Sequence, residues 1–242
     1  MTSDRSAPSE SSAATDLAQH LAGIAAVMLI PSSVASTERG IATLAVSLLE
    51  ACDEAAVCAP SGDPGDGLTS ELAAQLDQLQ DQHGQGPCWD TLGGLQSVYV
   101  SDLAEDLRWP LFAPSAVELG FRSVLAYCLT AEGATVGGLQ FFGRLPGAFN
   151  AYERAQGLIF ATYAGTAMSL ARTREHDQAV RENLAQALAS REVIGQAQGI
   201  LMERERITAD QAFELLRRAS QHLNIKLRAI AQQLVDTGRV EG

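Results

Sequence analysis

The sequence predicts an α+β domain with an antiparallel sheet and flanking helices, then a long connecting helix, then an all-α module of three helices. Up to about residue 150, short strand-like apolar runs alternate irregularly with helical stripes, and the last two runs are spaced as a hairpin. Residues 150–202 contain no proline and few glycines, which favours one long helix. A chain of 242 residues can hold two modest domains.

The beginning of the chain changes from a polar tail to helical stripes. Residues 1–15 are rich in Ser and Ala and lack an apolar stripe, so we expect a disordered tail. One apolar stripe then begins at Leu17 and stops before Pro31, and a second runs from Ile41 to Ala51. Both have helical spacing, and both helices are expected to flank the sheet.

The strands of the first domain are short and bounded by turn residues. We expect strands at residues 53–59, near Leu68, and at 98–100, 123–130 and 135–142, with a helix at 71–83. The segment SGDPGDG separates the first two and is typical of a turn. The last two strands are joined by AEGA, in which Gly133 can adopt a positive φ angle.

The long connecting helix carries a stripe at coiled-coil spacing. Its members alternate in threes and fours, which favours a parallel dimer, although the two polar residues weaken the seam: Val180, Leu184, Ala187, Arg191, Ile194, Gln198 and Leu201. The alternative is a single-chain helix that packs this stripe on the first domain, and periodicity alone does not separate the two.

Three short helices are expected in the stretch from residue 193 to 236, broken at Thr208 and Asn224, which both favour helix starts. Thr208 and Gln211 form a capping-box pattern, and Gly238 is a candidate C-cap. Gly199 lies in mid-helix, where glycine costs about 1 kcal/mol relative to alanine, so we expect something to pack closely there. The expected buried stripes are Ala212, Leu215, Leu216 and Ala219, and then Ile225, Leu227, Ile230, Ala231 and Leu234.

A local basic patch distinguishes this module from the rest of the chain, whose net charge is -12. No acidic residue lies between Leu215 and Ile230, and Lys226 is the only lysine in the sequence. Such a patch suits phosphate groups, whereas the acidic balance argues against nonspecific nucleic-acid binding by the whole chain. The alternative is the solvated face of a helical bundle. The patch consists of Arg217, Arg218, Lys226 and Arg228.

About the last fifty residues resemble the ANTAR family of RNA-binding transcription antiterminators. The matching positions are Ala197, Gly199, Leu201, Met202, Ala212, Phe213, Leu216, Arg217, Ser220, Gln221, Asn224, Lys226, Leu227 and Ala231. Two positions depart from the family: Arg206 stands where glycine is common, and Gln198 where a basic residue is common. The resemblance implies binding of paired hairpin loops in a leader RNA and an indirect effect on the RNA polymerase elongation complex.

The first domain resembles the GAF domains that are fused upstream of ANTAR modules. The resemblance rests on the segments GQGPCWD, RWPLFAP, RSVLAYCL and VGGLQFFGRLPGAF. It implies a module for ligand sensing or dimerisation, and the fold alone does not distinguish these. The expected division is a tail at 1–15, a GAF domain at 16–172, a helical linker at 173–192 and an ANTAR domain at 193–242.

No catalytic set or metal site is recognisable in the sequence, so we expect no enzyme. The four histidines are scattered, and GxSxG, Walker A and HExxH motifs are absent. The four cysteines contain no CxxC pair, so reduced, buried thiols are expected; a redox or sensing role for Cys88 is the alternative. The aromatic residues Trp89, Trp109, Phe112 and Phe121 fit core filling better than a ligand cavity. The ligand and cofactor of the GAF domain stay open, including haem at His83.

Taken together, the sequence predicts a cytoplasmic, homodimeric RNA-binding antitermination regulator with no membrane span, since no apolar run approaches about 20 residues. A DNA-binding transcription factor and a protein-interaction module are the alternatives, because a three-helix unit with arginines also describes a helix-turn-helix. The candidate RNA-binding residues are Ala197, Gly199, Arg217, Arg218, Ser220, Asn224, Lys226 and Arg228. Stacking of RNA bases on aromatic side chains should contribute little, because Phe213 lies in the apolar stripe of its helix and is expected in the core.

Overall fold

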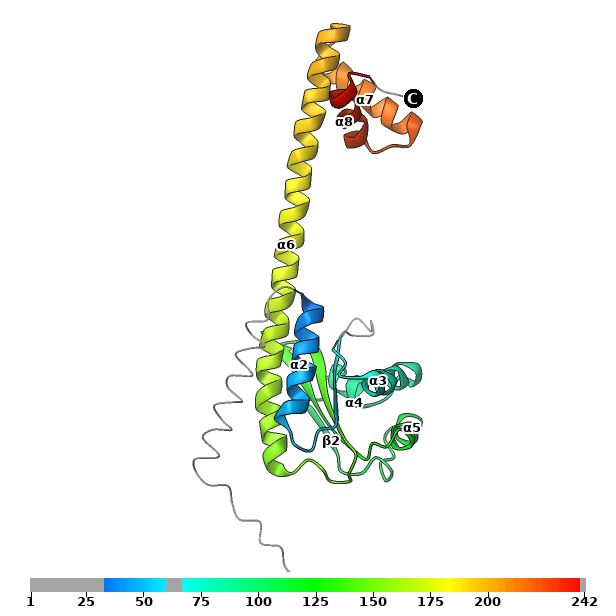
Figure 1. The fold of residues 1–242 in the computed structure, drawn as a ribbon, viewed down its shortest axis with the longest axis vertical. Helices are drawn as coiled ribbons and strands as arrows, with labels where there is room; N and C mark the ends of the chain where they lie inside the picture. Colours follow the sequence, from blue (N-terminus) through cyan, green and yellow to red (C-terminus); the bar gives the residue numbers. More distant parts are fainter. Residues whose placement is uncertain (1–32, 60–66, 240–242) are drawn as a thin grey trace, which may run out of the picture. The chain divides into compact units, whose positions relative to one another are not determined.

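The computed structural model describes residues 33–59 and 67–239 (Figure 1). The expected tail at 1–15, the helix before Pro31 and most of the SGDPGDG turn lie outside the described residues. The chain divides into two compact units, residues 1–175 and 176–242, which are described separately.

The first unit is built on an antiparallel four-stranded sheet in the order β1-β4-β3-β2. The strands are β1 (Glu54–Cys58), β2 (Ser97–Val100), β3 (Ser123–Ala131) and β4 (Ala134–Gly143). The expected hairpin between β3 and β4 is present, and Gly133 has a φ of 80°. The segment near Leu68 forms only an isolated bridge to Ala56, instead of the expected strand.

Helices cover both faces of this sheet (Figure 1). On one face lie α2 (Val34–Leu48) and the first part of α6 (Ala151–Glu205); on the other lie α3 (Glu71–His83), α4 (Pro87–Leu92) and α5 (Phe112–Glu118). The helix α2 begins earlier than its apolar stripe suggests, because Ser33 and Ser36 form a capping box. The short helices α4 and α5 were not expected.

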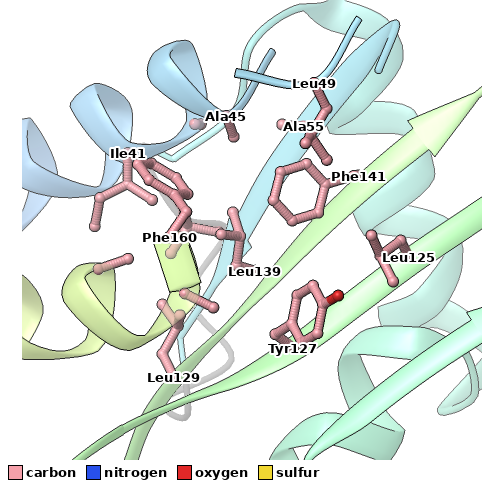
Figure 2. Close-up of a cluster of buried hydrophobic side chains, with 14 of the residues drawn as sticks. Ile41, Ala45, Leu49, Ala55, Leu125, Tyr127, Leu129, Leu139, Phe141 and Phe160 are labelled. Carbon is pink, nitrogen blue, oxygen red and sulfur yellow. The ribbon is translucent and has the colours of Figure 1, made fainter. Parts of the chain in front are cut away.

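Each face of the sheet has its own hydrophobic core, because alternate side chains of a strand point to opposite sides. Figure 2 shows the core beneath α2 and α6, where Ile41, Leu139, Phe141 and Phe160 meet. The opposite core contains Trp109, Phe112, Phe121 and Phe142. The helix α6 approaches the sheet closely because it carries glycines: a Cβ at Gly165 would lie 2.5 Å from the carbonyl oxygen of Thr130. The sheet therefore fixes the first part of α6.

The second unit contains the end of α6, α7 (Ala209–Leu223) and α8 (Leu227–Thr237). Thr208 and Gln211 form the expected capping box of α7, and Gly238 ends α8 with a φ of 70°. Apolar side chains from all three helices make one buried core, which closes the three-helix module: Ala197, Leu201, Ala212, Leu216, Ile230, Ala231 and Leu234.

The expected start of the third helix and two expected buried positions were wrong. Asn224 does not start the third helix; it ends α7 in the left-handed conformation, with a φ of 53°, and α8 begins at Leu227. Leu215 and Ile225 are exposed rather than buried.

None of the helices in the described ranges is both long and apolar enough to cross a membrane.

Candidate nucleic-acid interface

The basic residues of the second unit lie on two elements, α7 and the start of α8. Arg217 and Arg218 are on α7, Lys226 immediately precedes α8, and Arg228 lies in its first turn. All these side chains are exposed. The unit therefore presents cationic groups in the second half of one helix and at the start of the next.

Glu214 partly neutralises the α7 arginines. Arg217 makes a bidentate contact with it, since Nε donates to Oε2 at 2.9 Å and Nη2 donates to Oε1 at 2.8 Å. Nε of Arg218 donates to the same Oε1 at 3.3 Å. Hydrogen bonding from Arg217, followed by Arg218, lowers the pKa of Glu214 to about 2. The carboxylate is therefore charged at neutral pH, and the arginines meet a competitor for any phosphate.

Lys226 and Arg228 have no such competitor: within residues 33–59 and 67–239, no ion pair involves either side chain. The first turn of α8 contains no acidic residue, and Lys226 provides no side-chain cap. The free N–H groups and the dipole of a helix start favour anions. This end of α8 is the least neutralised part of the patch.

Ser220 and Asn224 build the turn that carries these cations. The hydroxyl of Ser220 donates to the carbonyl oxygen of Ile225 at 2.5 Å, and the N–H of Ile225 donates to the carbonyl oxygen of Ser220 at 3.1 Å. Asn224 supplies the left-handed residue between them, a conformation that asparagine tolerates better than most residues. Together these residues fix the backbone just before Lys226.

Ala197 and Gly199 differ from the expectation of close approach. Ala197 is completely buried in the three-helix core, so its side chain packs within the unit. Gly199 is exposed, and a Cβ there would meet nothing within 4 Å, so the expected close packing is absent within the described chain. Gln198, which replaces a common basic residue, donates from Nε2 to the carbonyl oxygen of Ala209 at 3.0 Å.

Phe213 was wrongly expected in the core: its side chain is 39% exposed. It precedes Arg217 by four residues and Ser220 by seven, so these residues share one face of α7. An exposed aromatic ring beside arginine can stack on a nucleobase. The helical register of α7 could have identified this exposure. Phe213 directly follows the buried Ala212 in sequence and so lies beside the buried stripe of the helix rather than on it.

In the first unit, the structure shows the state of the four cysteines and the burial of the aromatic side chains. Cys58 and Cys88 form a disulfide, which contradicts the expectation of reduced thiols, while Cys52 and Cys128 are free and buried. Trp109, Phe112 and Phe121 fill the core as expected, whereas Trp89 is 46% exposed. His83 ends α3. Within the described residues, no group of three or more His, Cys, Asp or Glu side chains could hold a metal ion.

Comparisons with known proteins assign both units. Residues 33–169 match the family model of the GAF domain, and residues 182–235 match that of the ANTAR domain. No curated protein matches the chain. Among solved structures, the chain is similar to the free methionine-R-sulfoxide reductase from Neisseria meningitidis, with 13% identity and a TM-score of 0.53, over 72% of this chain and 99% of that chain.

A second similar structure is the bacteriophytochrome RpBphP3 from the photosynthetic bacterium R. palustris. It has 9% identity and a TM-score of 0.51, over 79% of this chain and 44% of that chain. At these identities both similarities concern the fold alone.

Proposed function

Because this chain belongs to the GAF domain family and carries an ANTAR domain after it, as GAF–ANTAR regulators do, we propose that its carboxy-terminal unit binds paired hairpin loops in a leader RNA and opposes transcription termination. The effect on the RNA polymerase elongation complex is then indirect, through the RNA, and the protein acts in the cytoplasm. Both matched domains are regulatory rather than catalytic. For the domain limits we propose a GAF domain at 16–172, a linker at 173–192 and an ANTAR domain at 193–242.

The observation that carries this proposal is the arrangement of cations at the turn between α7 and α8. Lys226 and Arg228 lie at a helix start that has no acidic residue in its first turn, and they contact phosphates. Arg217, in the second half of the adjacent helix α7, adds a third cation once Glu214 releases it. Ser220 and Asn224 act by fixing the turn, and Ala197 acts by packing.

Recognition of unpaired bases falls to the α7 face that carries Phe213. Loop bases are splayed out and stack on aromatic rings or guanidinium planes. Phe213 and Arg217 offer both kinds of surface one helical turn apart. Gly199 leaves the backbone of α6 accessible, since nothing in the described chain occupies the space where a side chain would lie. Stacking surfaces beside an accessible helix backbone favour RNA loops, whose bases are unpaired, over duplex DNA.

Binding assays on the full chain test the proposal. An RNA pool of tandem hairpins with randomised loops is selected on the protein, and the selected RNA is compared with duplex DNA of equal charge. We expect the RNA to bind at least about a hundredfold more tightly, a difference of about 2.7 kcal/mol. Equal binding of both would favour the DNA-binding alternative, and enrichment of neither would favour a protein-interaction module.

Lys226→Ala serves as the site-specific test within that assay. Loss of one phosphate contact should reduce the salt slope of binding by about 0.7 to 0.9. The fold should remain intact, because an exposed charge contributes little to stability. Arg181→Ala, an exposed charge on α6 outside the patch, is the matched control and should bind as the parent does. A Lys226 variant that retains the parental slope contradicts the assignment of the patch.

We also propose that the regulator is a parallel homodimer through α6. In the part of α6 that belongs to the first unit, Tyr152, Ile159, Tyr163 and Leu170 are exposed apolar side chains. They fall on the same 3.5-residue repeat as Val180 and Leu184, which are 51% and 60% exposed. Exposed apolar residues that recur in one register are typical of a helix–helix interface. A second copy of the chain would cover them.

A further inference from the structure

The disulfide between Cys58 and Cys88 joins the end of β1 to α4. The two residues are 30 positions apart, their Cα atoms lie 6.3 Å from each other, and each is 5% exposed. The short helix α4 packs on the sheet beside β4 and β3. The bond therefore ties a peripheral helix to the edge strand β1 across the neighbouring β4.

The strand beneath this disulfide is shaped to receive it. Cys58 pairs in register with Gly138 of β4. A Cβ at Gly138 would lie 2.7 Å from Sγ of Cys58 and 2.7 Å from Oγ1 of Thr91, so any larger residue would displace both the sulfur and α4. The hydroxyl of Thr91 donates a hydrogen bond to the carbonyl oxygen of Cys88 at 2.9 Å. The sulfur site is thus built from β1, β4 and α4 together.

The helix α4 has a second attachment that does not depend on the sulfur atoms. The N–H of Cys88 donates to Oε1 of Gln80 at 2.8 Å, and Nε2 of Gln80 donates to Oε1 of Gln140 at 3.0 Å. All three residues are buried. After reduction, this relay still holds the start of α4, and two buried thiols pack as small apolar groups. The sheet does not depend on the disulfide, since β1 pairs with β4 along its whole length.

Local opening of α4 gives a reactant access to the buried sulfur atoms. The helix has six residues, and its N-cap is Gly86, which has no side chain that could cap the helix. A helix of this length is held by its packing rather than by its own hydrogen bonds, so it opens at a lower free energy than the whole unit. Nε2 of Gln140 is buried without a partner among the described residues, which further weakens the contact network under α4.

The remaining two cysteines are not paired. Cys52 lies in the connection between α2 and β1, Cys128 lies on β3, and both are free and buried. Burial raises the pKa of the Cys52 thiol to about 12, with the carboxylates of Asp53 and Glu54 adding to the shift, so little thiolate is present there at neutral pH. Among the four cysteines, only the pair on β1 and α4 is joined, which makes it the candidate for thiol–disulfide exchange.

We propose that Cys58 and Cys88 form a reversible thiol–disulfide switch, with low-molecular-weight thiols and disulfides as its reactants, that ties α4 and the exposed Trp89 to the sheet when oxidised. In reduction, an external thiolate attacks one sulfur, forms a mixed disulfide and releases the other cysteine as a thiol. A second external thiol attacks the mixed disulfide, giving the external disulfide and the protein dithiol; oxidation is the reverse. The inference rests on the proposed cytoplasmic function, because disulfides there are usually transient and catalytic or redox-sensing.

Equilibration of the full chain in buffers of graded reduced-to-oxidised glutathione ratio tests the switch without any RNA. Alkylation and mass spectrometry should show complete, reversible conversion of Cys58 and Cys88 within the millimolar range, while circular dichroism stays constant. Amide exchange in residues 88–92 should accelerate at least about tenfold on reduction. A pair that stays oxidised in the most reducing buffer, that never oxidises, or whose reduction unfolds the unit overturns the proposal.

Matched cysteine variants localise the effect. Cys58→Ser and Cys88→Ser should each have fast amide exchange at 88–92 in all buffers, whereas Cys128→Ser should still convert as the parent does. In a Trp109→Phe background, the emission of Trp89 should follow the alkylation curve, because these are the only two tryptophans. If the cysteine pair converts reversibly but the chain does not bind RNA, the result counts against the proposed function only. If the chain binds RNA but the cysteine pair does not convert, the result counts against the switch only.

Discussion

The Glu214 carboxylate lies 2.8 Å from the Arg217 guanidinium and 3.3 Å from that of Arg218, so one acidic residue engages both arginines of α7. The three side chains lie within five consecutive positions on an exposed helix face. An RNA phosphate can reach these arginines only by displacing Glu214 or by sharing them with it. Glu214 is thus a built-in competitor of the proposed ligand.

Replacement of Glu214 by Gln should therefore strengthen RNA binding. We expect a gain of about three- to tenfold in affinity, on the order of 1 kcal/mol, and a steeper salt dependence, because two released arginines become available to phosphates. Fluorescence anisotropy with the selected hairpin RNA at several salt concentrations measures both. Glu182→Gln on α6 changes the net charge equally and should have little effect. Equal gains from both variants would point to general electrostatics instead of a local competitor.

Gly199→Leu should separate stability from binding. A side chain at this exposed helix position meets open space, so the substitution should stabilise the ANTAR unit by up to about 1 kcal/mol through helix propensity. RNA affinity should nevertheless fall at least about tenfold, because the side chain would stand between the α6 backbone and the RNA. Thermal melting and anisotropy measure the two effects, and Gly199→Ala should show the same stabilisation with a smaller loss. Parental affinity in both variants would remove Gly199 from the interface.

The elements that were predicted correctly are those with a local cause. The β3–β4 hairpin follows from two strand patterns around a loop with Gly133, and α6 follows from a long stretch without proline. Asn224 was misassigned because asparagine favours two opposite helix positions, the start and the left-handed end. The sequence around it does not say which one applies. The turn is settled by the bonds between Ser220 and Ile225.

Features that depend on tertiary contacts were not predictable from the sequence. The Cys58–Cys88 pair spans 30 residues and has no spacing motif, so only the packing of α4 on the sheet brings the sulfur atoms together. The helix α4 itself is too short for a periodic pattern to show. The ion pairs of Glu214 with the α7 arginines were not expected, because Glu214 lies one residue before the acid-free segment that begins at Leu215. Conversely, the basic patch is a feature of the sequence itself, and its side chains are exposed.

Asp77 on α3 should make the stability of the GAF unit depend on pH. Burial raises its pKa from 3.8 to about 6, with the Asp81 carboxylate adding to the shift. The folded state thus favours the protonated acid more than the unfolded state does. The stabilisation is fully present below about pH 4 and is lost as the pH rises through about 6.

Asp77→Asn should remove this dependence and raise the free energy of unfolding at pH 7 by on the order of 2 kcal/mol, with little change at pH 4. Urea unfolding monitored by tryptophan emission measures it, since both tryptophans lie in the GAF unit. Asp81→Asn, at an exposed neighbouring position, should give a smaller effect in the same direction. Unchanged pH dependence in Asp77→Asn would show that another group controls it.

The proposed dimer should depend on the apolar seam of α6. Val180 and Leu184 expose most of their side-chain surface in the single chain, and a second copy would bury them in the proposed seam. Replacing both with Asp places like charges in that seam at a cost of several kcal/mol if they are desolvated. Sedimentation equilibrium should then show monomers. Because two linked RNA contacts gain about a hundredfold or more from their effective concentration, the affinity for tandem hairpins should fall with the dimer.

A control variant distinguishes the seam from the general effect of added negative charge. Gln178→Asp with Gln186→Asp puts the same charges on α6 at exposed positions outside the 3.5-residue repeat, so this variant should remain dimeric. If the seam variant also remains dimeric, the interface lies elsewhere on the chain, and the exposed row of Tyr152, Ile159, Tyr163 and Leu170 becomes the next surface to change. A monomeric seam variant with parental affinity for tandem hairpins would mean that one ANTAR unit binds the RNA alone.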